Sequence, residues 1–93
     1  MRHLDPKTAE ERKRKILNWA VDHYIKTSRP IASSVIAEAA DLDLSSATIR
    51  SVLKELEDEG YLAQLHASSG RVPTDRGYRF YVDYLVGVQR LAA

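Results

Sequence analysis

The chain has 93 residues, of which 44% are hydrophobic and 29% are charged, and its formal net charge at pH 7 is +1. This length allows one small domain with a modest core. Cysteine is absent, which excludes a disulfide framework and thiolate zinc sites and is typical of a cytoplasmic protein. No apolar run is long enough to span a membrane, and no signal peptide is visible.

The first expected element is a helix from Asp5-Pro6 to about Thr27. Asp5 is a suitable N-cap, and proline is favoured at the first helical position. Apolar residues then recur at helical spacing: Ile16, Leu17, Ala20, Val21, Tyr24 and Ile25. The run 28–30, Ser-Arg-Pro, should end this helix, and Ile31 can form a strand of one or two residues.

A second, shorter helix is expected from Ser33-Ser34 to Ala40. The segment that follows it, 41–44, reads Asp-Leu-Asp-Leu and is expected to form the turn of a helix-turn-helix. Its alternation predicts that Leu42 and Leu44 are buried, whereas both aspartates should be exposed.

The segment 45–60 predicts the most clearly divided helix of the chain. Ser45 is a good N-cap, and Gly60 stands where a left-handed C-terminal residue belongs. At 100° per residue one face is apolar and should enter the core: Ile49, Val52, Leu53 and Leu56. The outward face is small, polar and basic: Ser46, Ala47, Arg50, Ser51 and Lys54. Such a face can enter a DNA major groove, although an ordinary solvated helix face has the same pattern.

A two-stranded ribbon is expected next. The run 61–65 is apolar and strand-like, residues 66–70 have the composition of a loop, and residues 71–73 make the return strand. Gly70 should need a positive φ, and Arg71 should lie at the ribbon tip. A helix followed by such a ribbon is the layout of a winged helix-turn-helix, so the predicted fold class is mainly α with a small β-ribbon. The wing of such a fold lies over the DNA backbone or minor groove, where arginine is attracted.

The last expected helix runs from about 75 to 91, with Thr74 as its cap. One apolar stripe is expected to pack on the winged domain: Tyr78, Tyr81, Val82 and Leu85. A second stripe is expected to contact another chain or a further domain: Phe80, Tyr84, Val88 and Leu91. The alternative is that the helix wraps the domain and buries both stripes. We therefore divide the chain into a winged helix-turn-helix domain over 1–77 and a linking helix over 78–93.

Basic residues are unevenly distributed along the chain. Residues 1–15 hold six bases against three acids, and residues 66–79 hold three arginines against one acid. Acid collects at the end of the third helix, in Glu55, Glu57, Asp58 and Glu59. That end of the helix is expected to point away from DNA or to contact other protein.

The sequence gives little support for enzyme activity. The three histidines are far apart on different elements, and none has metal-ligand spacing with another histidine. No Gly-rich phosphate loop is present, because Ser69-Gly70 has the composition of a turn. We therefore expect no catalytic residues, no metal and no cofactor.

Three blocks of residues carry a family resemblance. The first comprises 16–17, 24–27, 30–31 and Ser33, and the second comprises 44–45, 47–50 and 55–57. The third block is His66, Ser69-Gly70-Arg71, Pro73-Thr74-Asp75, Gly77-Tyr78-Arg79 and Tyr81-Val82-Asp83. Together they resemble the N-terminal domain of the bacterial heat-inducible transcription repressor family, HrcA. The family usually has Pro in place of Ser46 and Asn-Asp in place of Ser51-Val52, departures that concern the operator sequence rather than the fold.

The resemblance implies a sequence-specific DNA-binding domain of a repressor of heat-shock (chaperone) genes. Its partner would be double-stranded DNA with an inverted-repeat operator, read by a dimer. A C-terminal region beyond this chain would form the dimer and could contact a chaperone. The expected DNA-binding residues are Ser46, Ala47, Thr48, Arg50, Ser51, Lys54, Ser69, Gly70 and Arg71.

An alternative from another class is a winged helix used only for protein contact or dimerisation. It would explain the low net charge and the apolar last helix. It would not explain why Arg50 and Lys54 stand on an outward face beside an arginine-tipped wing.

Overall fold

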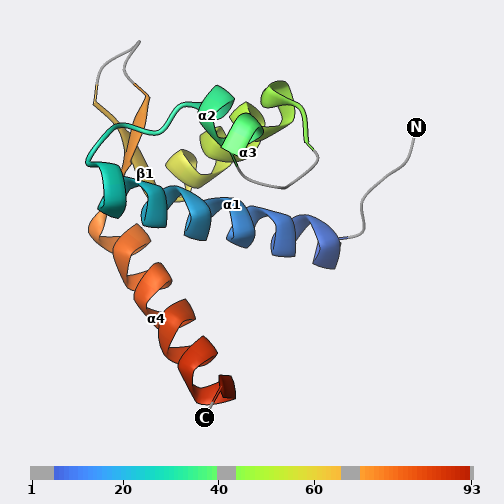
Figure 1. Ribbon diagram of the computed structural model, residues 1–93. Coiled ribbons are helices and arrows are strands. Elements are labelled where there is room, and N and C mark those ends of the chain that lie inside the picture. Colours follow the sequence, from blue (N-terminus) through green and yellow to red (C-terminus); the bar gives the residue numbers. More distant parts are fainter. Residues whose placement is uncertain (1–5, 40–43, 66–69, 93) are drawn as a thin grey trace.

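The described part of the chain contains four helices and one two-stranded antiparallel ribbon (Figure 1). The structure is a computed structural model, and it describes residues 6–39, 44–65 and 70–92. The elements are α1 (Pro6–Thr27), α2 (Ser33–Ala39), α3 (Ser46–Asp58), β1 (Leu62–Gln64), β2 (Arg71–Pro73) and α4 (Asp75–Ala92). This order confirms the predicted fold class, a winged helix-turn-helix that is mainly α with a small β-ribbon. Among the described helices, none combines the length and apolar character that crossing a membrane requires.

The end of α1 connects to the wing through a single backbone bridge. Ser28 has a φ of 57° in the left-handed region, and its N–H donates to the carbonyl of Tyr24 at 2.7 Å, which closes the helix. Ile31 then pairs with Arg71, because the N–H of each donates to the carbonyl of the other at 2.7 and 3.0 Å. The predicted strand at Ile31 is therefore confirmed as a one-residue bridge.

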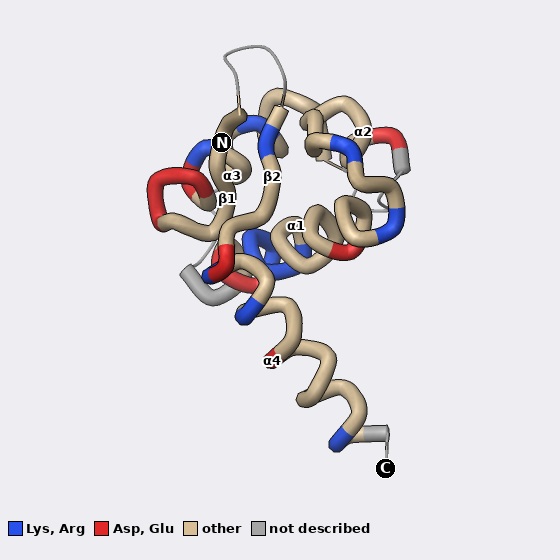
Figure 2. Tube along the Cα trace, turned by 90° about the vertical axis from the view of Figure 1, so that its left-hand side faces the viewer, with Lys and Arg blue, Asp and Glu red and all other residues tan. Residues whose placement is uncertain are grey.

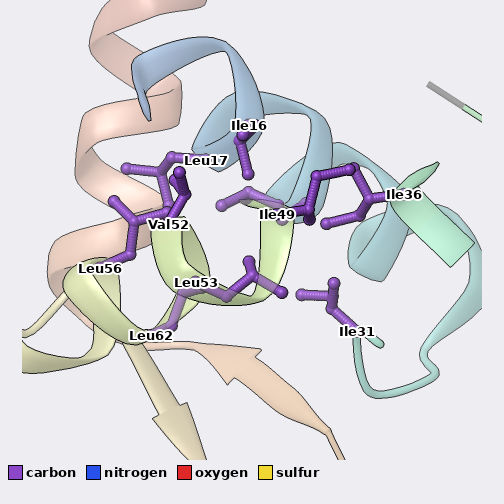
Figure 3. Packing of buried hydrophobic residues seen from close by; sticks show 11 residues of the cluster. Ile16, Leu17, Ile31, Ile36, Ile49, Val52, Leu53, Leu56 and Leu62 are labelled. Atoms are coloured by element: carbon purple, nitrogen blue, oxygen red, sulfur yellow. The ribbon is translucent and has the colours of Figure 1, made fainter. Parts of the chain in front are cut away.

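The core lies between α1, α2, α3 and the start of β1 (Figure 3). Its buried apolar side chains are Ile16, Leu17, Ala20, Val21, Ile31, Ile36, Ile49, Val52, Leu53, Leu56 and Leu62. The apolar face predicted for the third helix is thus confirmed. Leu44 is half-buried and packs against this cluster, whereas Ala40 and the rest of the predicted turn, including Leu42, lie outside the described residues.

The termini of α3 follow its capping residues. The Ser45 side chain accepts a hydrogen bond from the N–H of Thr48, which satisfies one of the free donors of the first turn. At the other end Gly60 has a φ of +87°, the left-handed conformation that the sequence predicted there. The helix therefore begins and ends where local chemistry requires, and α2 packs directly against it.

The wing is short and its register is fixed. Leu62 pairs with Pro73, Ala63 with Val72 and Gln64 with Arg71. Leu65, which we predicted as part of the first strand, lies beyond β1 and is 54% exposed. The last pair of the ribbon is Gln64 with Arg71, and Arg71 also pairs with Ile31.

The prediction of two stripes on α4 was wrong in part. Phe80, assigned to the outer stripe, packs against the core cluster and meets Tyr61 edge to face at a centroid distance of 5.6 Å. Val82 and Leu85, assigned to the inner stripe, are 53% and 41% exposed. Tyr84, Val88 and Leu91 of the outer stripe are exposed as predicted.

The direction of α4 explains this difference. Gly77 lies so close to the backbone of Tyr61 that a Cβ there would overlap its carbonyl oxygen, and the Tyr81 hydroxyl donates to Asp22 on α1 at 2.7 Å. Beyond these contacts α4 runs away from the other elements (Figure 1). Burial along α4 therefore depends on distance from the domain as well as on helix face, and the alternative in which α4 wraps the domain is wrong.

Candidate nucleic-acid interface

The outward face of α3 is exposed as the sequence predicted. Ser46, Ala47, Arg50, Ser51 and Lys54 are all exposed, and Thr48 is half-buried beside them. The opposite face is held in the core by four buried side chains, so the orientation of the outward face is fixed by packing. The small residues of the first turns leave room for another backbone or a base edge to approach.

The hydroxyl groups of Ser45, Thr48 and Ser51 take part in local hydrogen bonds. The Ser45 hydroxyl donates to Thr48 Oγ1 at 3.0 Å while it accepts from the Thr48 N–H at 3.2 Å. The Ser51 hydroxyl donates to the carbonyl of Ala47 at 3.3 Å, one turn back. Thr48 therefore takes part in the cap, and Ser51 is turned along the helix rather than straight outward.

The two basic residues on this face differ in whether they form an ion pair. Lys54 forms an ion pair with Asp58 at 3.2 Å, but both side chains are 62% exposed, so the pair is weak and readily exchanged. Arg50 makes no ion pair with any described residue and is exposed. It is the base that is available to a ligand without loss of an existing contact.

The wing carries the predicted glycine conformation. Gly70 has a φ of +82°, and a Cβ built on it would lie 2.7 Å from the carbonyl oxygen of Ile31. Both facts restrict this position to glycine. Ser69 and His66, the other predicted wing residues, lie outside the described residues.

Arg71 lies at the loop end of the ribbon, opposite Gln64, but its side chain is bonded within the domain. Its Nε donates to Glu57 Oε1 at 2.8 Å, and its side chain is only 15% exposed. The sequence predicted that Arg71 contacts DNA from the wing, which stays a prediction, but it did not predict this ion pair. The backbone bridge to Ile31 ties this end of the ribbon to the domain, and the Arg71 side chain reaches the last turn of α3.

Two of the four acids at the end of α3 pair with bases from other elements. Glu57 pairs with Arg71, and Glu59 accepts from Lys13 Nζ at 2.7 Å. The hydrogen bond to Glu59 is the main cause that raises the pKa of Lys13 above its usual 10.5. Figure 2 shows the acidic run as a red segment at the end of α3. The sequence showed the acids but not their partners, because no local spacing rule connects residues so far apart along the chain.

Three further contacts involve the start of α4, and two of them join it to residues 60–61, which follow α3. The Thr74 hydroxyl donates to the carbonyl of Gly60 at 2.6 Å and accepts from the N–H of Gly77 at 3.1 Å. The Arg76 guanidinium lies over the Tyr61 ring, 4.6 Å from its centroid. Within the described residues no group of three or more histidines, cysteines, aspartates or glutamates could hold a metal ion.

These features define a class. A short helix packed across a second helix, with an exposed small and basic face and a following antiparallel wing, is a winged helix-turn-helix. Over most of its length the chain is similar to the N-terminal portion of the heat-inducible transcription repressors named HrcA, which confirms the resemblance seen in its sequence.

The curated relatives and one solved structure support this statement. The chain is 52% identical to HrcA of Clostridium tetani over 84 residues, which are 90% of this chain and 24% of the relative. It is 52% identical over 77 residues to HrcA of Acetivibrio thermocellus, and 50% identical over 80 residues to HrcA of Chlorobium phaeovibrioides, each match covering 22% of the relative. A crystal structure of a protein described as hypothetical superposes with a TM-score of 0.80 at 43% identity, covering 83% of this chain and 25% of the other. No family model matches the chain.

The chain spans about a quarter of the length of the curated relatives it matches. The relatives are repressors by name, which fits the expectation that this segment carries no enzyme activity.

Proposed function

We propose that this chain is the DNA-reading segment of a heat-inducible transcription repressor. The observation that carries the proposal is the outward face of α3: small at its N-terminal end, basic at Arg50 and Lys54, and fixed by the buried opposite face. In a helix-turn-helix the N-terminal residues of the second helix contact base edges in the major groove. The sequence identity of 52% to two proteins named as repressors supports the same function.

Each residue of the site has a proposed role. Ser46 and Ala47 allow close approach to the groove floor, and Arg50 reaches a guanine edge. Lys54 exchanges Asp58 for a phosphate at low energetic cost, because the pair is exposed. The Ser51 hydroxyl can donate to a phosphate oxygen after it gives up the Ala47 carbonyl, whereas the Thr48 hydroxyl oxygen accepts from Ser45 and its own O–H can donate to a phosphate. Ser69 and Gly70 bring the wing backbone to the DNA backbone.

The wider setting is also part of the proposal. The operator is an inverted repeat near heat-shock (chaperone) genes, and it is read by a dimer in the cytoplasm. The dimer forms through the part of the repressor that follows this segment, and that part could also contact a chaperone. A single reader of this size makes few DNA contacts, so joining two copies raises the effective concentration at the second half-site.

A mobility-shift titration at low salt tests the proposal. The duplex that binds the wild-type chain most tightly is selected from a pool of randomised inverted repeats. This selected duplex is compared with a scrambled duplex of the same composition. We expect tighter binding to the selected duplex. Equal binding to both duplexes would overturn sequence-specific reading, because phosphate contacts alone do not distinguish sequences.

A second candidate function, a module for protein contact, is favoured by one observation. From residue 82 onward α4 exposes large apolar side chains, namely Val82, Tyr84, Leu85, Val86, Val88 and Leu91. If no selected duplex binds better than the scrambled one, while α4 mediates self-association, this function replaces DNA reading.

A further inference from the structure

The pair formed by Arg71 and Glu57 differs from the other ion pairs of the chain. The side chains of Arg71 and Glu57 are 15% and 26% exposed. In the part of the chain that the structure describes, each pair within a single helix has at least one side chain that is 48% exposed or more, as in Lys13–Glu10 at 15% and 48% and Lys26–Asp22 at 70% and 37%. Among the described residues, the Arg71–Glu57 pair is also one of two that join elements distant in the sequence, the other being Lys13–Glu59. A shielded pair between elements constrains their relative position more than an exposed pair does.

The backbone of Arg71 has little freedom to move. On one side Arg71 pairs with Gln64 in the wing, and on the other it exchanges two backbone hydrogen bonds with Ile31. The preceding residue, Gly70, contacts the Ile31 carbonyl so closely that no Cβ fits there. Arg71 therefore cannot follow a DNA phosphate by a shift of the wing without breaking these contacts.

Turning the side chain outward would also be unfavourable. A phosphate that captured the Arg71 guanidinium would leave Glu57 half-buried without its cation. Lys54, whose partner is readily accessible to water, carries no such penalty. The two bases, both near α3, therefore differ in their availability to DNA.

We propose that Glu57 is a positioning residue of the DNA reader. It holds the Arg71 guanidinium at the loop end of the β1–β2 ribbon, which fixes the wing relative to α3, and Arg71 itself makes no phosphate contact. Lys13–Glu59 ties α1 to the same turn, so the acidic end of α3 joins α1, α3 and the wing into one rigid reader. This inference rests on the proposed function, because its measured outcome is DNA binding.

Salt dependence separates positioning from direct contact. Each phosphate that a base neutralises adds roughly 0.9 to the slope of log affinity against log salt on duplex DNA. A base whose charge is already cancelled by Glu57 adds nothing. We therefore expect the salt slope of Arg71→Ala to equal that of the wild type.

The test measures affinity for the selected and scrambled duplexes between about 50 and 200 mM salt, the range over which phosphate contacts are resolved. The variants are Glu57→Gln, Arg71→Ala and the double variant. We expect each single variant to lose about tenfold in affinity for the selected duplex, with the slope unchanged. The double variant should lose no more than either single one, since both remove the same pair.

A matched control is available in the same turn. Glu55→Gln removes the same charge from an exposed residue that pairs with no described residue. It should leave the preference for the selected duplex intact. If Glu57→Gln unfolds the chain, as judged by circular dichroism at the binding temperature, Arg71→Lys replaces it. That variant keeps the charge but loses the Nε donor, and it should lower selected binding without altering the slope.

Three outcomes overturn the inference. One is a slope that falls by about one unit in Arg71→Ala, which would show a phosphate contact. Another is that Glu57→Gln binds both duplexes more tightly and with a steeper dependence of log affinity on log salt, which would show that a released Arg71 reaches DNA. The third is a Glu57→Gln variant that binds like Glu55→Gln. A wild-type chain that prefers no duplex would instead refute the proposed function and the positioning role with it.

Discussion

At the scale of single residues, Arg50 is the side chain whose proposed role in DNA recognition can be tested most directly. It lies one turn into α3, it is exposed, and no described residue forms an ion pair with it. Because it gives up no such partner on binding, its full interaction with DNA should appear in the measured affinity. Arg71 shows the opposite case, in which a base close to the same helix is already bonded within the domain.

We expect Arg50→Ala to weaken binding to the selected duplex by about 1–3 kcal/mol, because a bidentate contact to a guanine edge would be lost. Quantitative mobility shifts on selected and scrambled duplexes would measure this. Arg90→Ala, near the end of α4 and far along the chain from the reading face, is the matched control. Equal losses on both duplexes would reassign Arg50 to a phosphate, and no loss would remove it from the interface.

Gly70 and Gly87 make a second comparison between single positions. Gly70→Ala should destabilise the chain by more than about 1 kcal/mol, since φ is +82° and the added Cβ would meet Ile31. Gly87→Ala should stabilise it by about 0.5–1 kcal/mol, since it lies inside α4 with nothing within 4 Å of the added Cβ. Urea unfolding of both variants provides the measurement. Similar shifts for the two would contradict the strain assigned to Gly70.

At the scale of elements, the helices differ in how completely they are covered. α3 is held on one face by the core and at both ends by caps, so its outward face is well defined. α4 is held only in its first half, by Gly77, Tyr81 and Phe80, and its second half is left with exposed apolar residues. The division into a domain over 1–77 and a linking helix over 78–93 stays a prediction, although residues 77–81 belong structurally to the packed part.

We expect the chain to sediment as a monomer, or as a weak dimer through the second half of α4. Val88→Glu with Leu91→Glu should abolish any such dimer, because both side chains are exposed and apolar. Phe80 is unsuitable for this test since it supports the fold. Gln89→Glu adds charge to another face and serves as the control. A tight dimer that survives the double substitution would place the interface elsewhere.

At the scale of the whole molecule, the link between α1 and α4 makes stability depend on pH. The Tyr81 hydroxyl donates to Asp22, and this bond, followed by the one from Lys26, lowers the pKa of Asp22 below 3.8. The same bond is the main cause that raises the pKa of Tyr81 above 10.0. The Asp22 contribution is therefore present above its ordinary pKa and lost as pH falls through the lower folded value. The Tyr81 contribution is present below pH 10.0 and lost as pH rises through the higher folded value.

Tyr81→Phe should accordingly lower the free energy of unfolding by about 1 kcal/mol at neutral pH and flatten both its acid and its alkaline dependence. Thermal unfolding between acid and alkaline pH gives this profile. Tyr84→Phe is the control, because the Tyr84 hydroxyl bonds to no described residue. An unchanged profile in Tyr81→Phe would show that the bond does not tie α4 to α1.

The sequence by itself determined the helix ends, the wing glycine and the two faces of α3, because each of these depends on local chemistry. Proline at the start of α1, Ser45 and Gly60 around α3, and Gly70 in the wing each act on the backbone within a few residues of themselves, so they could be predicted without the fold. The division of α3 into a buried and an outward face likewise follows from helical periodicity. These local signals are sufficient to predict the outward face of α3 and the resemblance to the repressor family.

Only the tertiary structure decided which distant groups meet. Glu57 and Arg71, and Lys13 and Glu59, are joined by packing of α1 and the wing around the end of α3, and no periodicity encodes such pairs. The same holds for α4, where the axis direction relative to the domain determined that Phe80 is covered and Val82 is not. Helical periodicity assigns a residue to a face of its helix, whereas contact also depends on where that face lies along a neighbouring surface.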